Sequence, residues 1–154
     1  MIYLVSKNKT MLTSLAYKLA TIDNVVKYCQ DKPVLGVDTE TEGMDFTCKK
    51  VVMFQIGDHD NQFVIDTRTD DIEPLRDILE SKEIIKIFHN AKFDYKFIRK
   101  SFDIKCEGIY DTFLVERIIS CGKKLGYGLK DVCKRYLNVE LNKAFFKQCC
   151  KYGE

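Results

Sequence analysis

One short apolar run limits the folds available to this chain more than any other feature. Residues 34–37 (Val-Leu-Gly-Val) follow Pro33 and are apolar at successive positions. This pattern is typical of a strand that is buried on both faces, so we expect a central strand of a sheet here. The run ends directly at Asp38-Thr39-Glu40, which places two acids at the carboxyl end of the predicted strand, where ligands gather in open α/β sheets.

The flanking segments predict further strands and several helices. Two β-rich runs, 51–56 and 62–65, are separated by a turn-forming cluster and favour an antiparallel hairpin. Helical spacing or capping residues predict helices at 22–31, 74–79, 90–102, from Asp111 onward and at 129–137, and a second buried strand at 84–88. Because a helix between strands implies a parallel crossover, we expect an α/β fold with a mixed sheet and flanking helices.

Composition fits one compact cytoplasmic domain. The 154 residues are 45% hydrophobic, contain no linker-like stretch and match the size of a single domain covering residues 1–154. No apolar run approaches the roughly 18 residues of a membrane span, so no membrane partner is expected. The seven cysteines are odd in number and never spaced as C-x-x-C, which argues against a disulfide framework and against a zinc site.

Positive charge gathers near the carboxyl end. Residues 122–151 hold eight of the 25 lysines and arginines and only two acids. Such asymmetry is compatible with a single-stranded nucleic acid backbone, or with an ordinary solvated helix face. The residues concerned are Lys123, Lys124, Lys130, Lys134, Arg135, Lys143 and Lys147. No base-reading motif accompanies them, so sequence-specific binding is not expected.

The two acids after the first strand form a candidate cation site. Side chains alternate along a strand, so Asp38 and Glu40 project to the same side, about 7 Å apart along the backbone. Neighbouring carboxylates repel each other unless a positive charge lies between them, and divalent hard cations prefer oxygen ligands. The simpler alternative is that acids at a strand end merely face water.

A third acid follows the second buried strand. Residues 84–88 run directly into His89-Asn90, and Asp94 falls in the first turn of the next helix. If the two strands are parallel neighbours, Asp94 faces Asp38 and Glu40. By itself, an acid in a first turn is also explained by its favourable interaction with the helix dipole, worth about 0.3–1 kcal/mol. That explanation does not account for the whole set of three acids.

These motifs resemble the DEDD (DnaQ-like) 3'-5' exonuclease family, in particular the proofreading domain of DNA polymerase I and RNase D. Residues 38–44 (DTETEGM) are similar to the first motif of the family and residues 89–94 (HNAKFD) to the second. Further similar segments follow in the same order, so that the resemblance covers residues 34–143. They are 54–57 (FQIG), 64–67 (VIDT), 110–112 (YDT), 129–132 (LKDV) and 141–143 (LNK).

The resemblance implies an RNase H-like fold and phosphodiester hydrolysis with two divalent cations, Mg²⁺ or Mn²⁺, roughly 3.5–4 Å apart. Asp38, Glu40 and Asp94 would be the catalytic metal ligands, and Glu40 would also reach the terminal 3' hydroxyl. Substrate contacts are expected from Thr39, Met44 and Asn90. Met44 would wedge against the last bases of the substrate; a core methionine is the alternative.

The third motif of the family has no counterpart in this sequence. A Tyr or His followed by a fourth acid is expected on a final helix beyond Lys143, but Glu154 is the last residue. We therefore expect a chain truncated before that motif, with the final helix absent, supplied by another polypeptide or lost. Asp111 could replace the fourth acid, although capping of a helix is the favoured interpretation.

The predicted function is that of a metal-dependent 3'-5' exonuclease domain acting on single-stranded DNA or RNA 3' ends. One context that fits is the amino-terminal proofreading part of a family A-type DNA polymerase. Because an acidic ligand is missing, the alternative is a weakly active or inactive nucleic-acid-binding module on the same fold.

Overall fold

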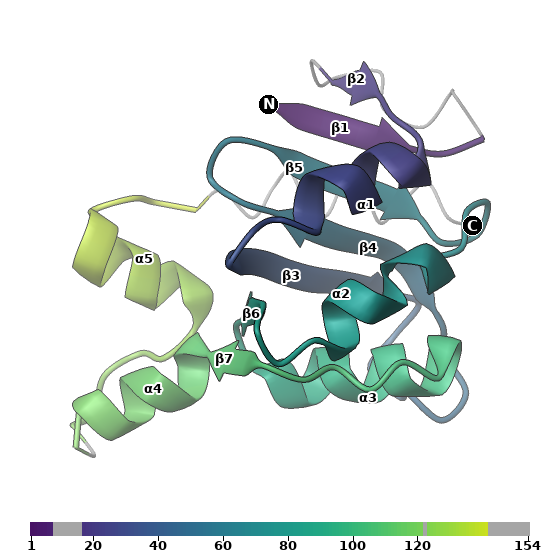
Figure 1. Cartoon of the computed structure of the whole chain (residues 1–154). Coiled ribbons are helices and arrows are strands. Elements are labelled where there is room, and N and C mark those ends of the chain that lie inside the picture. Colours follow the sequence, from purple (N-terminus) through teal and green to yellow (C-terminus); the bar gives the residue numbers. More distant parts are fainter. Residues whose placement is uncertain (8–16, 122, 142–154) are drawn as a thin grey trace.

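The computed structural model describes residues 1–7, 17–121 and 123–141. Within these residues, seven strands form one mixed sheet in the order β2-β1-β5-β4-β3-β6-β7, flanked by helices (Figure 1). The strands are β1 (Ile2–Val5), β2 (Lys18–Leu19), β3 (Val34–Thr41), β4 (Val51–Gly57), β5 (Gln62–Asp66), β6 (Ile85–Phe88) and β7 (Ile109–Asp111). The helices are α1 (Ile22–Cys29), the 3₁₀ turn η1 (Glu73–Leu75), α2 (Arg76–Glu80), α3 (Ala91–Phe102), α4 (Thr112–Ile119) and α5 (Leu129–Leu137).

The α/β prediction with a mixed sheet is confirmed. Strands β4 and β5 form the expected antiparallel hairpin, and β3 pairs with β6 in parallel, with Val34 opposite Ile85. The chain between β5 and β6 forms η1 and α2, where a helix was predicted at 74–79, and these elements bury Leu75, Ile78 and Leu79. Strands β1, β2 and β7, of two to four residues, were not predicted.

One expectation for β3 was wrong. The strand is interior in the sheet, but only one of its faces is covered by the described residues: Leu35 and Val37 are buried, whereas Val34 is 39% exposed. Two small residues on the open side, Val34 and Gly36, made the run look uniformly apolar. Asp38 continues that open side, so its side chain lies on the side of β3 opposite to Leu35 and Val37.

The core lies between the covered face of the sheet and helices α1, α2 and α3. It combines strand residues such as Phe54 and Ile65 with helix residues such as Val25, Leu79 and Ile98. Each fully buried side chain of this size contributes about 1.5–3 kcal/mol relative to exposure. This packing fixes the position of α3, the helix that carries Asp94, against the sheet.

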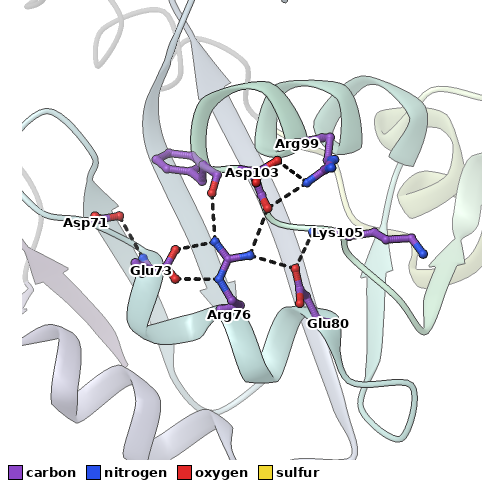
Figure 2. Close-up of polar contacts among 8 residues, drawn as sticks. Asp71, Glu73, Arg76, Glu80, Arg99, Asp103 and Lys105 are labelled. Atoms are coloured by element: carbon purple, nitrogen blue, oxygen red, sulfur yellow. Dashed lines mark hydrogen bonds and ion pairs between the residues drawn. The ribbon is translucent and has the colours of Figure 1, made fainter.

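A polar network fixes the far end of α3 (Figure 2). Arg76 of α2 donates to the backbone oxygens of Phe102 and Asp103, at 3.3 and 3.0 Å, where α3 ends. Its guanidinium is held by Glu73, at 2.6 and 2.7 Å, and by Glu80 at 3.0 Å. Carbonyl groups at a helix end lack helical partners, so this contact anchors α3 at the end opposite to Asp94.

Helices α4 and α5 form at the expected residues but with unexpected faces. Leu114, Ile118 and Ile119 follow helical spacing, yet they are 53–74% exposed, and Glu116 is the buried residue of α4. Helix α5 has no buried residue. The periodicity of an amphipathic helix identifies its apolar face but not whether a partner covers it. Among the described residues, no helix has the length and apolar composition needed to cross a membrane.

Candidate active site

The three acids are delivered to one region by the parallel pairing of β3 and β6. Asp38 and Glu40 lie in the second half of β3, opposite Gln55 and Met53 of β4. Strand β6 runs alongside β3 and ends at Phe88, and α3 begins three residues later at Ala91. Since neighbouring parallel strands end at the same edge of a sheet, the first turn of α3, with Asp94, comes next to the end of β3.

Two hydrogen bonds join Asp94 directly to β3. The backbone N–H of Thr39 donates to Asp94 Oδ1 at 3.1 Å, and the Thr39 hydroxyl donates to the same oxygen at 2.6 Å. Asp94 is only 3% exposed and Thr39 only 6%. The carboxylate of Asp94 is therefore held in one orientation at the residue between the two strand acids.

The electrostatics of the three acids show that they influence one another. Desolvation raises the pKa of Asp38 to about 6, with the charge of Glu40 as the next cause. Desolvation likewise raises the pKa of Asp94 to about 6, and the charge of Asp38 adds to it, while the Thr39 hydroxyl opposes the shift. Each raised pKa means that the charged form is disfavoured. A positive charge placed among them would relieve this cost.

The donor set fits hard divalent cations. All three side chains offer carboxylate oxygens, the ligands that Mg²⁺ and Mn²⁺ prefer, and the raised pKa values of Asp38 and Asp94 favour a compensating cation. Their ligand atoms are not gathered as closely as those of Asp58, His59 and Asp60, the one group among the described residues with all ligand atoms within 4.8 Å.

The Asp58, His59 and Asp60 group is explained by its turn. Asp58 accepts from Tyr28 and from the backbone N–H groups of Asp60 and Asn61, and pairs with Lys32 at 2.9 Å. These partners hold the pKa of Asp58 well below its usual range, with the bond to Lys32 as the largest cause. Its oxygens already have partners, and His59 is an exposed residue of the same turn.

Asn90 is the N-cap residue of α3, but its side chain makes no capping hydrogen bond. It adopts a left-handed conformation (φ 71°). Asp111, the last residue of β7, accepts from the backbone N–H groups of Asn90 and Ala91 at 3.0 and 2.9 Å, and also from Phe113 and Leu114 at 2.9 and 3.4 Å. Asp111 therefore caps two helices, which confirms the capping interpretation.

Residues at the start of α4 also hold His89 in place. The hydroxyl of Thr112 donates to the Phe88 carbonyl at 2.9 Å, so His89 Nδ1, at 2.9 Å from that hydroxyl, is the donor of their contact. The imidazole also lies edge-on to Phe113, with 5.8 Å between the ring centroids. Strand β7 and the start of α4 thus fix the residue immediately before Asn90.

Met44 is not a core residue. It is 82% exposed, which rules out the alternative that it packs in the interior. With Asn90 it lines a cavity of about 500 Å³ between the segment 44–46 and helix α3. Sequence reasoning missed other residues of this cavity, among them Phe46 and Lys96, because a loop aromatic residue and a surface lysine carry no motif of their own.

The basic residues near the carboxyl end do not share one role. Lys123, Lys124 and Lys130 are exposed, whereas Arg135 is paired with the buried Glu116 and donates to the Gly126 carbonyl at 2.7 Å. Lys134 pairs with Glu140 at 3.0 Å. Lys143 and Lys147, and the region where the third motif was sought, lie outside the described residues.

Comparison with known proteins identifies the family. A family model described as 3'-5' exonuclease matches residues 14–153. The chain is 28% identical over 125 residues to DNA polymerase I of Aquifex aeolicus, covering 80% of this chain and 20% of the relative. It is 26% identical over 130 residues to human exosome complex component 10, covering 83% and 14%. The chain thus spans at most a fifth of the length of these two relatives.

Solved structures show the same fold. Escherichia coli RNase D superposes with a TM-score of 0.72 at 19% identity, covering 92% of this chain and 34% of the other. Brucella melitensis NrnC superposes with a TM-score of 0.69 at 22% identity, covering 92% and 62%. These neighbours have the RNase H-like arrangement that the motifs implied. The match over residues 14–153 shows that this chain belongs to the DEDD (DnaQ-like) 3'-5' exonuclease family.

Proposed function

We propose that this chain is a metal-dependent exonuclease domain that removes nucleotides from single-stranded 3' ends by phosphodiester hydrolysis. The observation that carries the proposal is the two hydrogen bonds from Thr39 to Asp94, which join the second acidic motif to the first. Membership of the exonuclease family supports it. A structure of the neighbour NrnC has been solved with bound pGG, and we propose a nucleic acid substrate for this chain as well.

Asp38, Glu40 and Asp94 are the residues that would hold two divalent cations. Cations held there would supply Lewis-acid catalysis at the phosphate and would make a water molecule a better nucleophile near neutral pH. The chain itself supplies orientation. Thr39 fixes the carboxylate of Asp94 and Asp111 fixes the start of α3. The Thr39 hydroxyl already donates to Asp94. We therefore propose that Thr39 positions that ligand and that it meets the substrate near the end of β3.

Met44 and Asn90 are proposed to contact the last nucleotides of the substrate. Both line the same cavity, and Met44 is exposed enough to meet a base directly. A flexible thioether adapts to surfaces of different shape, so this contact suits any base. DNA and RNA 3' ends are therefore both candidate substrates, and a proofreading role within a family A-type polymerase is the context proposed from the relative in Aquifex aeolicus.

We also propose that a helical segment from outside the described residues completes the site. Leu114, Ile118 and Ile119 on α4 and Leu137 on α5 are more than half exposed, and α5 packs no residue fully. Apolar surface of this extent on one pair of helices usually marks an interaction site. A helix with a complementary apolar face and one acid would cover it and add a fourth carboxylate.

The central test is digestion of 5'-labelled single-stranded DNA and RNA with Mg²⁺ or Mn²⁺. We expect stepwise shortening from the 3' end, and a loss of about a hundredfold or more in rate for Asp38→Ala and Asp94→Asn, because several kcal/mol of barrier depend on metal ligands. Asp77→Ala, an exposed acid on α2, is the matched control and should retain full activity.

Two results would reject the proposal. Shortening without a divalent cation, or shortening that survives Asp38→Ala, would show that the activity does not arise at this site. Binding of single strands with no turnover under either cation would instead support the alternative of an inactive nucleic-acid-binding module.

A further inference from the structure

Two adjacent residues at the start of α4 contact the segment that leads into α3. Asp111 is the last residue of β7 and the N-cap of α4, and Thr112 is the first residue of α4. Strand β7 pairs with β6 in parallel, with Asp111 opposite Phe88, the last residue of β6. This register places the start of α4 beside the two residues that connect β6 to α3.

The carboxylate of Asp111 serves both helix starts. Its Oδ1 accepts from the backbone N–H of Asn90 at 3.0 Å, and its Oδ2 accepts from that of Ala91 at 2.9 Å. The same Oδ1 accepts from the N–H groups of Phe113 and Leu114 on α4, at 2.9 and 3.4 Å. The first N–H groups of a helix have no partner within the helix, so removal of this one carboxylate takes an acceptor from the starts of both α3 and α4.

Asn90 depends on contacts from outside its own side chain. It has φ 71° and ψ 51°, in the left-handed region, and its side chain makes no capping hydrogen bond. Residues other than glycine adopt this region rarely and keep it where the surrounding structure holds them. Asp111 binds the N–H of Asn90, and the carbonyl of Asn90 accepts from the N–H of Phe93 at 3.0 Å. The cap of α4 therefore also holds the start of α3.

Thr112 adds a second link between α4 and the same segment. Its hydroxyl donates to the Phe88 carbonyl at 2.9 Å and accepts from His89 Nδ1 at 2.9 Å. The other ring nitrogen of His89, Nε2, is buried and has no hydrogen-bond partner among the residues that the structure describes. Within that part of the chain, Thr112 is thus the residue that orients the imidazole by hydrogen bonding.

The start of α3 matters because it carries Asp94. Asp94 lies four residues after Asn90, in the first turn of α3, and Thr39 donates twice to its Oδ1. Thr39 holds the carboxylate, whereas the backbone of the first turn sets where the side chain begins. Both matter for a metal ligand, since removal of the partners that orient a ligand typically lowers metal affinity by roughly 10–100-fold.

Helix α4 is held at its start more firmly than on its outer face. Leu114 and Ile118 are 53% and 74% exposed. The buried carboxylate of Glu116 pairs with Arg135 of α5, so part of the support of α4 comes from α5. A change in α5 can therefore loosen α4, and the shared carboxylate of Asp111 transmits that change to the start of α3.

We infer that Asp111 is a positioning residue of the candidate cation site and couples this site to α4 and α5. This assignment rests on the proposed function, because it takes Asp38, Glu40 and Asp94 to hold the cations. It adds a form of regulation: contacts that stabilise α4 and α5 raise the affinity of the three acids for Mg²⁺ or Mn²⁺, and contacts that loosen these helices lower it. Asp111 acts through the backbone of α3 and is not itself a metal ligand.

The substitution Asp111→Ser separates the two caps. Serine is a good N-cap residue, so its hydroxyl can still accept from the N–H groups of α4. One oxygen on a shorter side chain does not replace two carboxylate oxygens, so the contacts with Asn90 and Ala91 are lost. The matched control is Thr21→Ala, which removes the side-chain cap of α1, a helix that carries none of the three acids. Urea unfolding measures what each substitution costs in stability.

Two measurements compare these variants with the unsubstituted full chain. Amide hydrogen exchange in EDTA reports on the start of α3 without any cation, and electron paramagnetic resonance of free Mn²⁺ reports cation binding without substrate. We expect Asp111→Ser to accelerate exchange at residues 90–94 and to weaken Mn²⁺ binding by about tenfold. Thr21→Ala should leave both unchanged, although it also loses a helix cap.

The unsubstituted chain provides a check that does not depend on any variant. One carboxylate binds the amides of Asn90, Ala91 and Phe113. If α3 and α4 are coupled through it, these three amides should show the same free energy of opening in hydrogen exchange. Amides of α4 that open much more easily than those of residues 90 and 91 would contradict the coupling.

Arg135→Gln tests the connection to α5. By itself, this substitution should loosen α4 and weaken Mn²⁺ binding. Combined with Asp111→Ser, it should cause no further loss of Mn²⁺ affinity, because the link through which it acts is already absent. A fully additive loss in the double variant would show that α5 reaches the acids by another route and would contradict the role of Asp111.

Unchanged exchange at residues 90–94 in Asp111→Ser, or equal Mn²⁺ affinities for Asp111→Ser and Thr21→Ala, would overturn the inference. These outcomes are separable from a failure of the proposed function. If Asp111→Ser accelerates this exchange but the unsubstituted chain binds no cation, the coupling of α4 to α3 stands and the proposed metal-dependent function falls. If hydrolysis requires Asp38 and both capping variants bind Mn²⁺ alike, the proposed function stands and this inference falls.

Discussion

The sheet with α1, α2 and α3 differs sharply from the pair α4 and α5. In the first region, residues such as Phe54, Leu79 and Ile98 are fully buried in a continuous core. In the second, Leu114, Ile118, Ile119 and Leu137 are exposed, and an ion pair between Glu116 and Arg135 joins the two helices. Figure 1 shows the two helices beside β7, at one end of the sheet.

This difference separates two ways of holding a helix. Helix α3, which carries Asp94, is fixed by apolar packing along its length, by Asp111 at its start and by Arg76 at its end. Helices α4 and α5 depend on polar contacts and on whatever covers their apolar faces. We therefore expect the candidate site acids to be rigid and the stability of α4 and α5 to depend on additional structure.

Deletion of core volume should give the largest effect. Ile65→Ala removes a side chain with no exposed area and should cost about 2–5 kcal/mol of unfolding free energy, from lost burial and a cavity. Leu137→Ala on α5, where the side chain is 68% exposed, should cost less than about 0.5 kcal/mol. Urea unfolding measures both. Equal costs would show that α5 is covered in solution, which would remove the contrast.

The acids at the edge of the first region should produce a pH effect of up to about 3 kcal/mol. The pKa of Asp94 is raised from 3.8 to about 6, so the folded state holds its proton more tightly than the unfolded state. The protonated carboxyl of Asp94 therefore adds to the free energy of unfolding below pH about 4, and this contribution is lost as pH rises to about 6. Asp94→Asn should therefore gain stability relative to the unsubstituted chain between pH 4 and 7.

Thermal melting in EDTA at a series of pH values measures that difference. When EDTA is replaced by Mg²⁺ or Mn²⁺, the unsubstituted chain should be stabilised above pH 6 but not at pH 4, because a cation needs ionised carboxylates. A difference between the two proteins that does not change with pH would show that Asp94 is not desolvated as described.

A polar substitution should act on the second region alone. Arg135→Gln leaves the buried carboxylate of Glu116 without its charged partner and should cost about 2 kcal/mol locally. Amide hydrogen exchange should show faster exchange in α4 and α5, with β3 and β4 unchanged. Uniform acceleration across the chain would mean that both regions unfold as one unit.

The smallest effect is expected at the exposed face of α4. Ile118 is 74% exposed, so Ile118→Gln should change the unfolding free energy by less than about 0.5 kcal/mol. If a helical segment from outside the described residues covers this face, the same change should weaken that association. Thermal melting of the chain with and without such a segment distinguishes a change in the stability of the chain itself from a weakened association. A large loss in the chain alone would contradict the exposure of α4.

Much of the candidate site could be predicted from local patterns. The order of strand, acid pair, second strand and helix placed Asp38, Glu40 and Asp94 at element ends, and the parallel pairing of β3 with β6 confirms the premise that joined them. Capping by Asp111 was also predictable, because a helix start needs acceptors for its free N–H groups. Its second role, at the start of α3, was not, since that contact spans about twenty residues.

The sequence by itself determined which segments become strands and helices and which of their sides are apolar, because these properties depend on neighbouring residues. Only the tertiary structure decided which apolar sides are covered and which side chains from distant segments meet. Val34 and Ile118 face outward despite their apolar character, and Phe46 meets Lys96 and Phe97 across fifty residues. Burial and such contacts are properties of how the elements pack, and local periodicity carries no record of them.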